Sequence, residues 1–302
     1  MLLAAIAAVA GAQPSECAAC HPSQVEKHAA TRHARALRPA AASDFAQALP
    51  TAPLGEARGG FLLSYERQGA GLEVTAVREG ATHAHATIDW VFGAGDQGVT
   101  PVARIGERWF EHRISYYPRR DRFDLTLGHQ PGLSKSAEAA IGIEQPPLTI
   151  RNCFGCHATV SADIEVKRAG VECVRCHAGA AEHAQGKGTP LNPAKVPPSV
   201  QVEICAECHR AAPPNGNADD PLNIRFQPMR LVSSKCYRAG KLVCTTCHPA
   251  HEDVRKADAS FYREKCLQCH VSPHRMKEDC AGCHMPKSSP APYLSFSDHF
   301  IR

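Results

Sequence analysis

Short runs of apolar and β-branched residues recur between about Leu54 and Ile150, separated by glycine or proline. Such runs of four to ten residues with turn residues between them are typical of β-strands. Gln68–Gly71 joins the first two runs and predicts a hairpin connection. The expected strands are Phe61–Tyr65, Leu72–Val77, Thr87–Phe92, Val99–Ile105, Arg108–Tyr117 and Phe123–Leu127. This insert is interpreted either as a cover that positions a cofactor or docks a partner, or as a structural insert without chemistry.

The rest of the chain has a different pattern. Ser23–Leu37 favours a helix, whereas Ala184–Ser199 and Ala211–Pro221 are rich in glycine, proline, asparagine or aspartate and predict linkers. Met1–Ala12 is small and apolar and ends in small residues, as signal sequences do before cleavage. It is shorter than the ~20 residues that span a bilayer. We therefore expect residues 1–12 to be a signal-peptide remnant and the protein to be periplasmic or extracellular.

The cysteines change this picture most. Fourteen of the 15 fall into seven copies of Cys-x-x-Cys-His. Two thiols at this spacing can each bond one vinyl group of a haem, and the adjacent histidine then ligates the iron. A zinc knuckle or a redox dithiol is the alternative for one copy, but zinc sites would use motifs in pairs and seven is odd. The sequence thus predicts seven covalently attached haem c groups, bound by Cys17, Cys20, Cys153, Cys156, Cys173, Cys176, Cys205, Cys208, Cys244, Cys247, Cys266, Cys269, Cys280 and Cys283, with His21, His157, His177, His209, His248, His270 and His284 as proximal iron ligands.

Ten further histidines lie outside the motifs. Seven would complete bis-histidine ligation, and the four methionines are too few for many His/Met sites, so low redox potentials are expected. The predicted distal ligands are His33, His183, His251 and His299, followed by His129, His112 and His274. Asp298 is expected to support the ring of His299. His83 and His85 should share one face of a strand, and His28 is interpreted as a surface residue.

Low aromatic content, 6%, suggests that something besides side chains fills the interior. The predicted fold class is a mainly α and irregular backbone wrapped around seven haems, with a β-rich insert. The expected domains are an N-terminal mono-haem segment at 13–53, the insert at 54–150 and a hexahaem domain at 151–302. The formal charge is +4, and no cluster of Lys and Arg on one face favours a nucleic-acid partner.

Cys236 is the one cysteine outside the motifs. Burial as an inert thiol is the first interpretation. The alternatives are a group that ligates or faces a haem iron, a sulfur-substrate site or a link to another chain, with Tyr237, Arg238 and Lys241 as nearby polar groups.

Three stretches carry a family resemblance: Cys244–His251, Cys280–Lys287 and Ser297–His299. They resemble the multihaem cytochromes c with doubled Cys-x-x-Cys-His motifs, a group similar to the tetrahaem carrier of ammonia oxidisers, hydroxylamine oxidoreductase and octahaem tetrathionate reductase. In that group most haems are bis-histidine electron-transfer sites. Catalytic members use a motif that ends in lysine or a tyrosine cross-link, whereas all seven motifs here end in histidine.

Two functions follow as hypotheses. The first is a periplasmic or extracellular heptahaem cytochrome c that relays electrons between a redox protein donor and acceptor, with no catalytic residue assigned. The alternative is an oxidoreductase that acts on a small nitrogen or sulfur oxyanion at one five-coordinate haem. A membrane-associated redox partner and a homo-oligomer are the further partner hypotheses.

Overall fold

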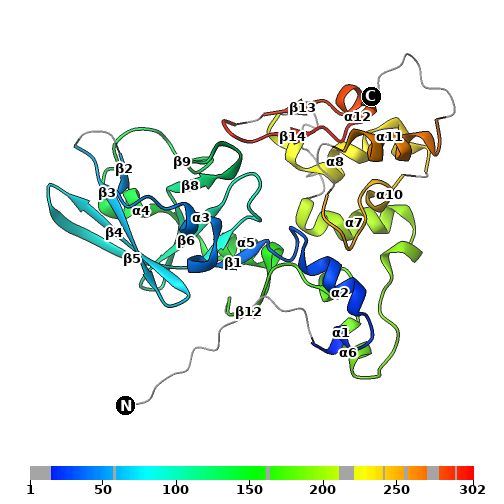
Figure 1. Ribbon diagram of the computed structural model, residues 1–302, viewed down its shortest axis with the longest axis horizontal. Helices are drawn as coiled ribbons and strands as arrows, with labels where there is room; N and C mark the ends of the chain where they lie inside the picture. The colour runs from blue at the N-terminus through cyan, green and yellow to red at the C-terminus, as the bar shows by residue number, and fades with distance from the viewer. Residues whose placement is uncertain are drawn as a thin grey trace. The chain divides into compact units, whose positions relative to one another are not determined.

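The computed structural model describes residues 15–56, 59–160, 164–210, 221–240, 242–254, 258–270, 279–289 and 291–302. The chain divides into two compact units (Figure 1). Unit 1 is Arg32–Glu172, and unit 2 combines the segment that ends at Thr31 with Cys173–Arg302. Each motif is named below by its first cysteine. The Cys153 motif therefore belongs to unit 1, and the Cys17 motif groups with the five motifs from Cys173 onward. The sequence instead placed the Cys17 motif in a segment of its own and the Cys153 motif with the other five.

Unit 1 is built on an antiparallel sheet that curls into a half-barrel. Its strands run in the order β10-β7-β6-β5-β4-β3-β2, and β1 also pairs with β5 (Figure 1). Their bounds are β1 Leu37–Pro39, β2 Leu54–Gly55, β3 Leu62–Gln68, β4 Gly71–Arg78, β5 Ala81–Phe92, β6 Thr100–Ile105, β7 Arg108–His112 and β10 Gly142–Gln145. Two further pairs are β8 Ile114–Tyr117 with β9 Arg122–Leu125, and β11 Ala158–Val160 with β12 Val166–Ala169.

The strands form where the sequence predicts them. Along β4, Leu72, Val74 and Ala76 alternate with more exposed neighbours and are at most 2% exposed, which is the period of a sheet with one buried face. The predicted hairpin is confirmed, because Gln68 pairs with Gly71 across the turn. Gly69 in that turn has a φ of 60°, a conformation that glycine adopts without strain.

Short helices close the half-barrel. They are η1 Ala40–Ala42, α3 Asp44–Ala48, η2 Pro118–Arg120, α4 Ala137–Ile141 and α5 Pro147–His157. The main core lies between the sheet and α3, with Phe45 fully buried at its centre. A second cluster forms where Ile150 and Phe154 of α5 pack with Leu37 and Val102. The Cys153 motif, at the end of α5, is thereby held on the sheet.

The predicted fold class was wrong. The chain is a mixed α/β protein with 36% helix and 26% strand, and is not a mainly α and irregular backbone wrapped around haems. The physical reason is that unit 1 fills its interior with its own side chains from β3 to β8 and α3. Low aromatic content did not imply an unfilled core, because aliphatic residues on the strands supply it.

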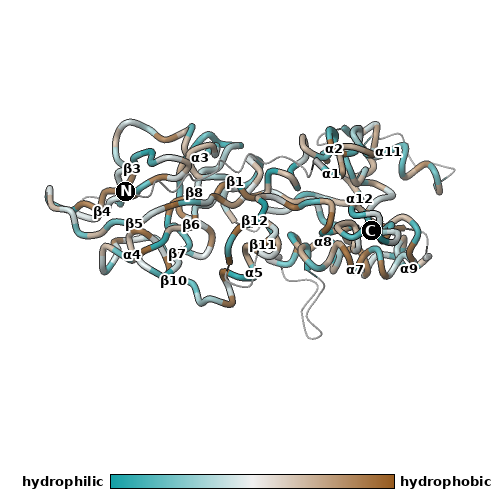
Figure 2. The backbone as a smooth tube through the Cα atoms, turned by 90° about the horizontal axis from the view of Figure 1, so that it is seen from below, coloured by the Kyte–Doolittle hydropathy of each residue, from teal (hydrophilic) through white to brown (hydrophobic). Residues whose placement is uncertain are grey.

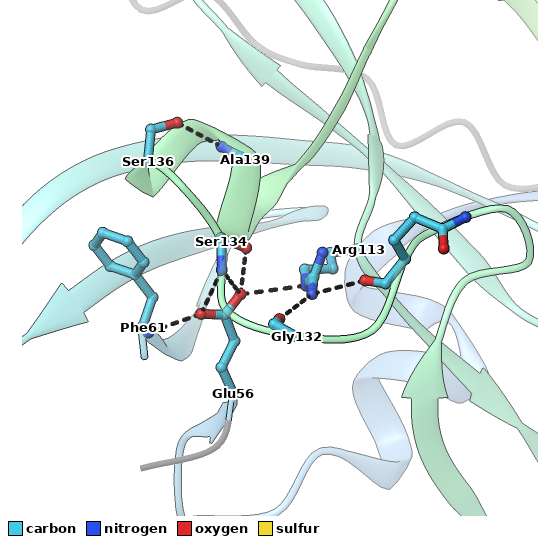
Figure 3. Close-up of polar contacts among 8 residues, drawn as sticks. Glu56, Phe61, Arg113, Gly132, Ser134, Ser136 and Ala139 are labelled. Carbon is cyan, nitrogen blue, oxygen red and sulfur yellow. Dashed lines mark hydrogen bonds and ion pairs between the residues drawn. The ribbon is translucent and has the colours of Figure 1, made fainter. Parts of the chain in front are cut away.

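A buried ion pair fastens the loop before α4 (Figure 3). The Glu56 carboxylate accepts hydrogen bonds from the backbone N–H of Ser134, at 2.9 Å, and of Phe61, at 3.2 Å. Arg113 lies 3.4 Å from the same carboxylate and donates to the carbonyls of Gln130 and Gly132. Both charged side chains are almost enclosed, 7% and 11% exposed, so several hydrogen bonds compensate their burial.

Ser136 caps α4, because its hydroxyl accepts a hydrogen bond from the N–H of Ala139 at 3.2 Å (Figure 3). We expect Ser136→Ala to lower the free energy of unfolding of unit 1 by about 1 kcal/mol. Ser136→Asp, which retains a capping oxygen, should remain close to the wild type. Urea unfolding followed by tryptophan fluorescence measures both, and equal losses in the two variants would contradict the capping role.

Unit 2 consists of short helices and turns. Its elements are α1 Ser15–Ala18, α2 Pro22–Ala29, η3 Cys173–Arg175, α6 Ala180–Ala184, η4 Pro193–Lys195, α7 Pro198–His209, η5 Pro221–Arg225, α8 Gln227–Val232, α9 Lys235–Arg238, α10 Cys244–Cys247, α11 Ala259–Leu267, α12 Cys280–His284, β13 Lys287–Ser288 and β14 Phe296–Ser297. Figure 2 shows the apolar stretch at α8, which supplies Met229 and Leu231 to the interior. In the described part of unit 2, the buried apolar side chains are Val202, Ile224, Pro228, Met229 and Leu231. This interior is much poorer in apolar side chains than that of unit 1.

The helix predicted at Ser23–Leu37 is shorter than expected. It ends at Ala29, where the hydroxyl and the N–H of Thr31 both donate to the carbonyl of His28. Leu37 instead enters β1 and pairs with Phe92. Across the described residues, no helix has the length and apolar character needed to cross a membrane. Residues 1–12, the predicted signal remnant, lie outside the described residues.

Candidate functional site

One local hydrogen bond recurs in the motifs. The N–H of the motif histidine donates to the carbonyl of the first cysteine, at 2.8 Å for His21 and 2.9 Å for His177. The same bond is 3.0 Å long in both the Cys244 and the Cys266 motifs. It closes one helical turn, which brings residues three and four apart in sequence onto one face. Both thiols and the imidazole of a motif are therefore presented together.

Every cysteine of the chain is a free thiol, and none is fully buried. Cysteines of different motifs nevertheless lie close to one another in unit 2. Cys205 and Cys244 share a hydrogen bond, which raises the pKa of the Cys205 thiol and lowers that of Cys244. Burial, together with neighbouring Cys280 and Cys247, raises the pKa of Cys266 to about 11. The Cys205 motif is thus next to the Cys244 motif, and the Cys266 motif is next to the Cys280 motif.

Several histidines have the same ring orientation. Nδ1 of His157 lies 2.9 Å from the carbonyl oxygen of Ala36, and Nδ1 of His177 lies 2.9 Å from that of Leu191. Nδ1 of His284 lies 2.5 Å from the carbonyl oxygen of Arg302. A carbonyl oxygen only accepts hydrogen bonds, so Nδ1 must carry the proton in each ring. The lone pair of Nε2 is then available to bind a metal.

Two pairs of imidazoles face each other in unit 2. The ring centroids of His177 and His251 are 6.0 Å apart with planes inclined by 14°, and those of His248 and His299 are 6.1 Å apart with planes inclined by 37°. Histidine nitrogens bind metals at roughly 2 Å, which places each ring centroid roughly 3 Å from the ion. Two rings about 6 Å apart therefore leave room for one metal ion between them.

Burial favours the neutral form of three of these rings, His248, His251 and His299. Burial and the facing His299 lower the pKa of His248 to about 4. Burial, the adjacent His177 and Lys27 lower the pKa of His251. Burial also lowers the pKa of His299, whose Nδ1 lies 3.0 Å from the carbonyl oxygen of Ser297. Unprotonated rings are the form that ligates a metal.

The histidines that pair in space are not those closest to each other in the sequence. His251 follows His248 by three residues, yet it faces His177. His28 is interpreted from the sequence as a surface residue, but it is only 9% exposed. Burial lowers the pKa of His28, and the nearby His251 lowers it further. The sequence did not indicate this burial, because the position of His28, four residues after Gln24 on α2, has no feature that distinguishes a buried histidine from an exposed one.

The remaining predicted ligands lie elsewhere. His33 is exposed in the turn after α2, and His183 is exposed, with its Nδ1 3.1 Å from the carbonyl oxygen of Gly188. His112 and His129 are buried in unit 1, where the Tyr65 hydroxyl lies 2.7 Å from Nε2 of His112. His274 lies outside the described residues. His83 and His85 are exposed on β5, as their alternation predicts.

The other motif histidines differ from one another in exposure. His21, His209 and His270 are exposed, whereas His157 and His284 are half-buried. Cys236, on α9, is half-buried beside motif cysteines, since it contributes to raising the pKa of both Cys247 and Cys266.

The prediction of seven covalently attached haem c groups is corrected by two findings. The β-rich unit 1 packs its own apolar core and does not resemble a haem-wrapped chain. Within the described residues, no group of three or more His, Cys, Asp or Glu side chains converges as a metal site. What these residues do bring together is two imidazole pairs, and the count of seven is not carried further.

Comparison with known proteins found no matching family model, no matching curated protein and no matching solved structure. The resemblance carried by the motifs stays a prediction.

Proposed function

We propose that the chain is an exported electron-transfer protein of the c-type cytochrome kind, which relays electrons between a protein donor and a protein acceptor through redox centres at the paired histidines of unit 2. The observation that carries the proposal is the pairing of His177 with His251 and of His248 with His299 at about 6 Å. In each pair one ring belongs to a Cys-x-x-Cys-His motif and the other lies outside the motifs. Imidazole nitrogens and thiolates are donors that suit a redox-active transition metal.

The arrangement favours transfer over catalysis. When bound, a redox metal would supply a one-electron change of charge. One ring of each pair, His177 and His299, has an Nδ1–H bond to a backbone carbonyl, which restrains that ring from turning. A metal held by both rings of a pair would have those two positions closed to a substrate.

Electron paramagnetic resonance of the oxidised, matured protein tests the proposal. We expect low-spin iron in the wild type, and one equivalent per chain converted to high-spin in His251→Ala and, separately, in His299→Ala. His85→Ala, an exposed histidine on β5, is the matched control and should change nothing. Free imidazole should restore the low-spin signal in each ligand variant.

Two outcomes would contradict the proposal. Unchanged spectra in both ligand variants would show that the pairs hold no iron. A high-spin equivalent in the wild type would instead favour the alternative function, reduction or oxidation of a small nitrogen or sulfur oxyanion at an open iron.

A further inference from the structure

A buried ion pair lies beside His299. Arg230, on α8, donates to the carboxylate of Asp298 through Nε at 2.8 Å and Nη2 at 2.7 Å. The side chains are 8% and 4% exposed, so both charges are almost withdrawn from water. We propose that this Arg230–Asp298 pair is the positioning device for His299, which holds the C-terminal strand so that the ring faces His248. The inference rests on the proposed function.

Asp298 makes hydrogen bonds to the backbone beside His299 and none to its imidazole. Its carboxylate accepts a hydrogen bond from the N–H of Phe300 at 2.9 Å, and its own N–H donates to the carbonyl of Pro286 at 3.0 Å. The ring of His299 has its contact to the carbonyl of Ser297. The residues on both sides of His299 are thus fixed, which leaves its side-chain torsions as the remaining freedom.

The aromatic neighbour is held by the same charges. The guanidinium of Arg230 lies 5.3 Å from the ring centroid of Phe300, and that of Arg302 lies 5.8 Å from it. Arg302 also reaches the Asp298 carboxylate, at 3.1 Å, but its side chain is 57% exposed. The buried Arg230 and the exposed Arg302 therefore offer a matched comparison on one carboxylate.

Stability alone does not account for this arrangement. Withdrawing a carboxylate and a guanidinium from water costs about as much as their attraction returns, and well-packed apolar residues often serve as well. Buried ion pairs are best attested where they define one arrangement among several. Here the arrangement defined is the position of the segment after β14 that carries His299, opposite the motif histidine.

The test compares variants in the matured protein by the signal assigned to the His248–His299 site, which is the one that His299→Ala removes. Asp298→Asn and Arg230→Met should alter the g values and midpoint potential of that signal alone. They should also make replacement of the axial ligand by added imidazole roughly tenfold faster. Arg302→Met should leave all three quantities unchanged.

A single substitution can unfold the chain by leaving one buried charge unpaired, so Arg230→Met/Asp298→Asn is made as well. This double variant removes both charges and should fold, with circular dichroism like that of the wild type, but still show the altered signal. An unaltered signal in the folded double variant would overturn the positioning role. The proposed function would survive that result, because it is contradicted by unchanged spectra in both His251→Ala and His299→Ala, or by high-spin iron in the wild type.

Discussion

Replacing Phe45 by alanine is expected to lower the free energy of unfolding of unit 1 by about 3–5 kcal/mol. The Phe45 side chain is fully buried at the centre of the main core. It makes edge-to-face contacts with Phe123 at 5.2 Å, Tyr65 at 5.5 Å and His112 at 6.1 Å between ring centroids. Alanine would leave a cavity surrounded by rings from different elements, which cannot all move inward.

Urea unfolding of the full chain measures this loss. Both tryptophans, Trp90 and Trp109, lie in unit 1, so their fluorescence follows that unit. Ile143→Ala on the edge strand β10 is the control, because its side chain is 44% exposed and a change within about 0.5 kcal/mol is expected. A Phe45→Ala loss no larger than that of the control would show that the core does not depend on this ring.

The strands of unit 1 could be predicted because their information is local. Alternation along Leu72–Val77 and the glycines at Gly69 and Gly71 specify two strands and their turn without reference to distant residues. Leu37 could not be assigned in this way. It continues an apolar helical pattern, but pairing with Phe92, 55 positions away, draws it into the sheet. The predicted run Arg108–Tyr117 likewise divides at Arg113, whose side chain turns to Glu56.

The candidate site also combines features that the local sequence predicts with features that depend on distant residues. Spacing within each motif specifies a helical turn, so the placement of its thiols and imidazole is predictable. The pairing of His177 with His251 joins residues from separate loops, and nothing in either local sequence indicates it. Asp298 was expected to support His299 directly, but the carboxylate instead binds Arg230, which lies on another element. Residues that act through long-range contacts are those that spacing alone does not reveal.

Unit 1 is expected to lose stability as the pH falls from about 6.5, because His112 is buried in neutral form. Burial lowers the pKa of His112 to about 3, and the nearby His129 contributes in the same direction. The groups packed around it carry no compensating charge: the Tyr65 hydroxyl lies 2.7 Å from Nε2, Phe45 contacts the ring, and the Ile141 backbone bond offsets only part of the effect of burial on the pKa of His112. Glu111, the neighbouring carboxylate on β7, lies 3.5 Å from Nε2 of His129.

The direction of this change in stability with pH follows from proton binding at His112. Between pH 6.5 and 3 the unfolded chain binds a proton at His112 that the folded chain does not, so stability falls with decreasing pH in that window. The loss should reach about 2 kcal/mol at pH 5 and stop growing below about pH 3. In His112→Gln, whose amide can still accept from Tyr65 but does not titrate, the dependence on pH should be shallower by roughly 1.4 kcal/mol per unit between pH 6 and 4. His85→Gln, a change at an exposed histidine on β5, should retain the wild-type dependence. Urea midpoints followed by tryptophan fluorescence at each pH give the comparison, and parallel curves for His112→Gln and the wild type would show that His112 is not the buried group that acid titrates.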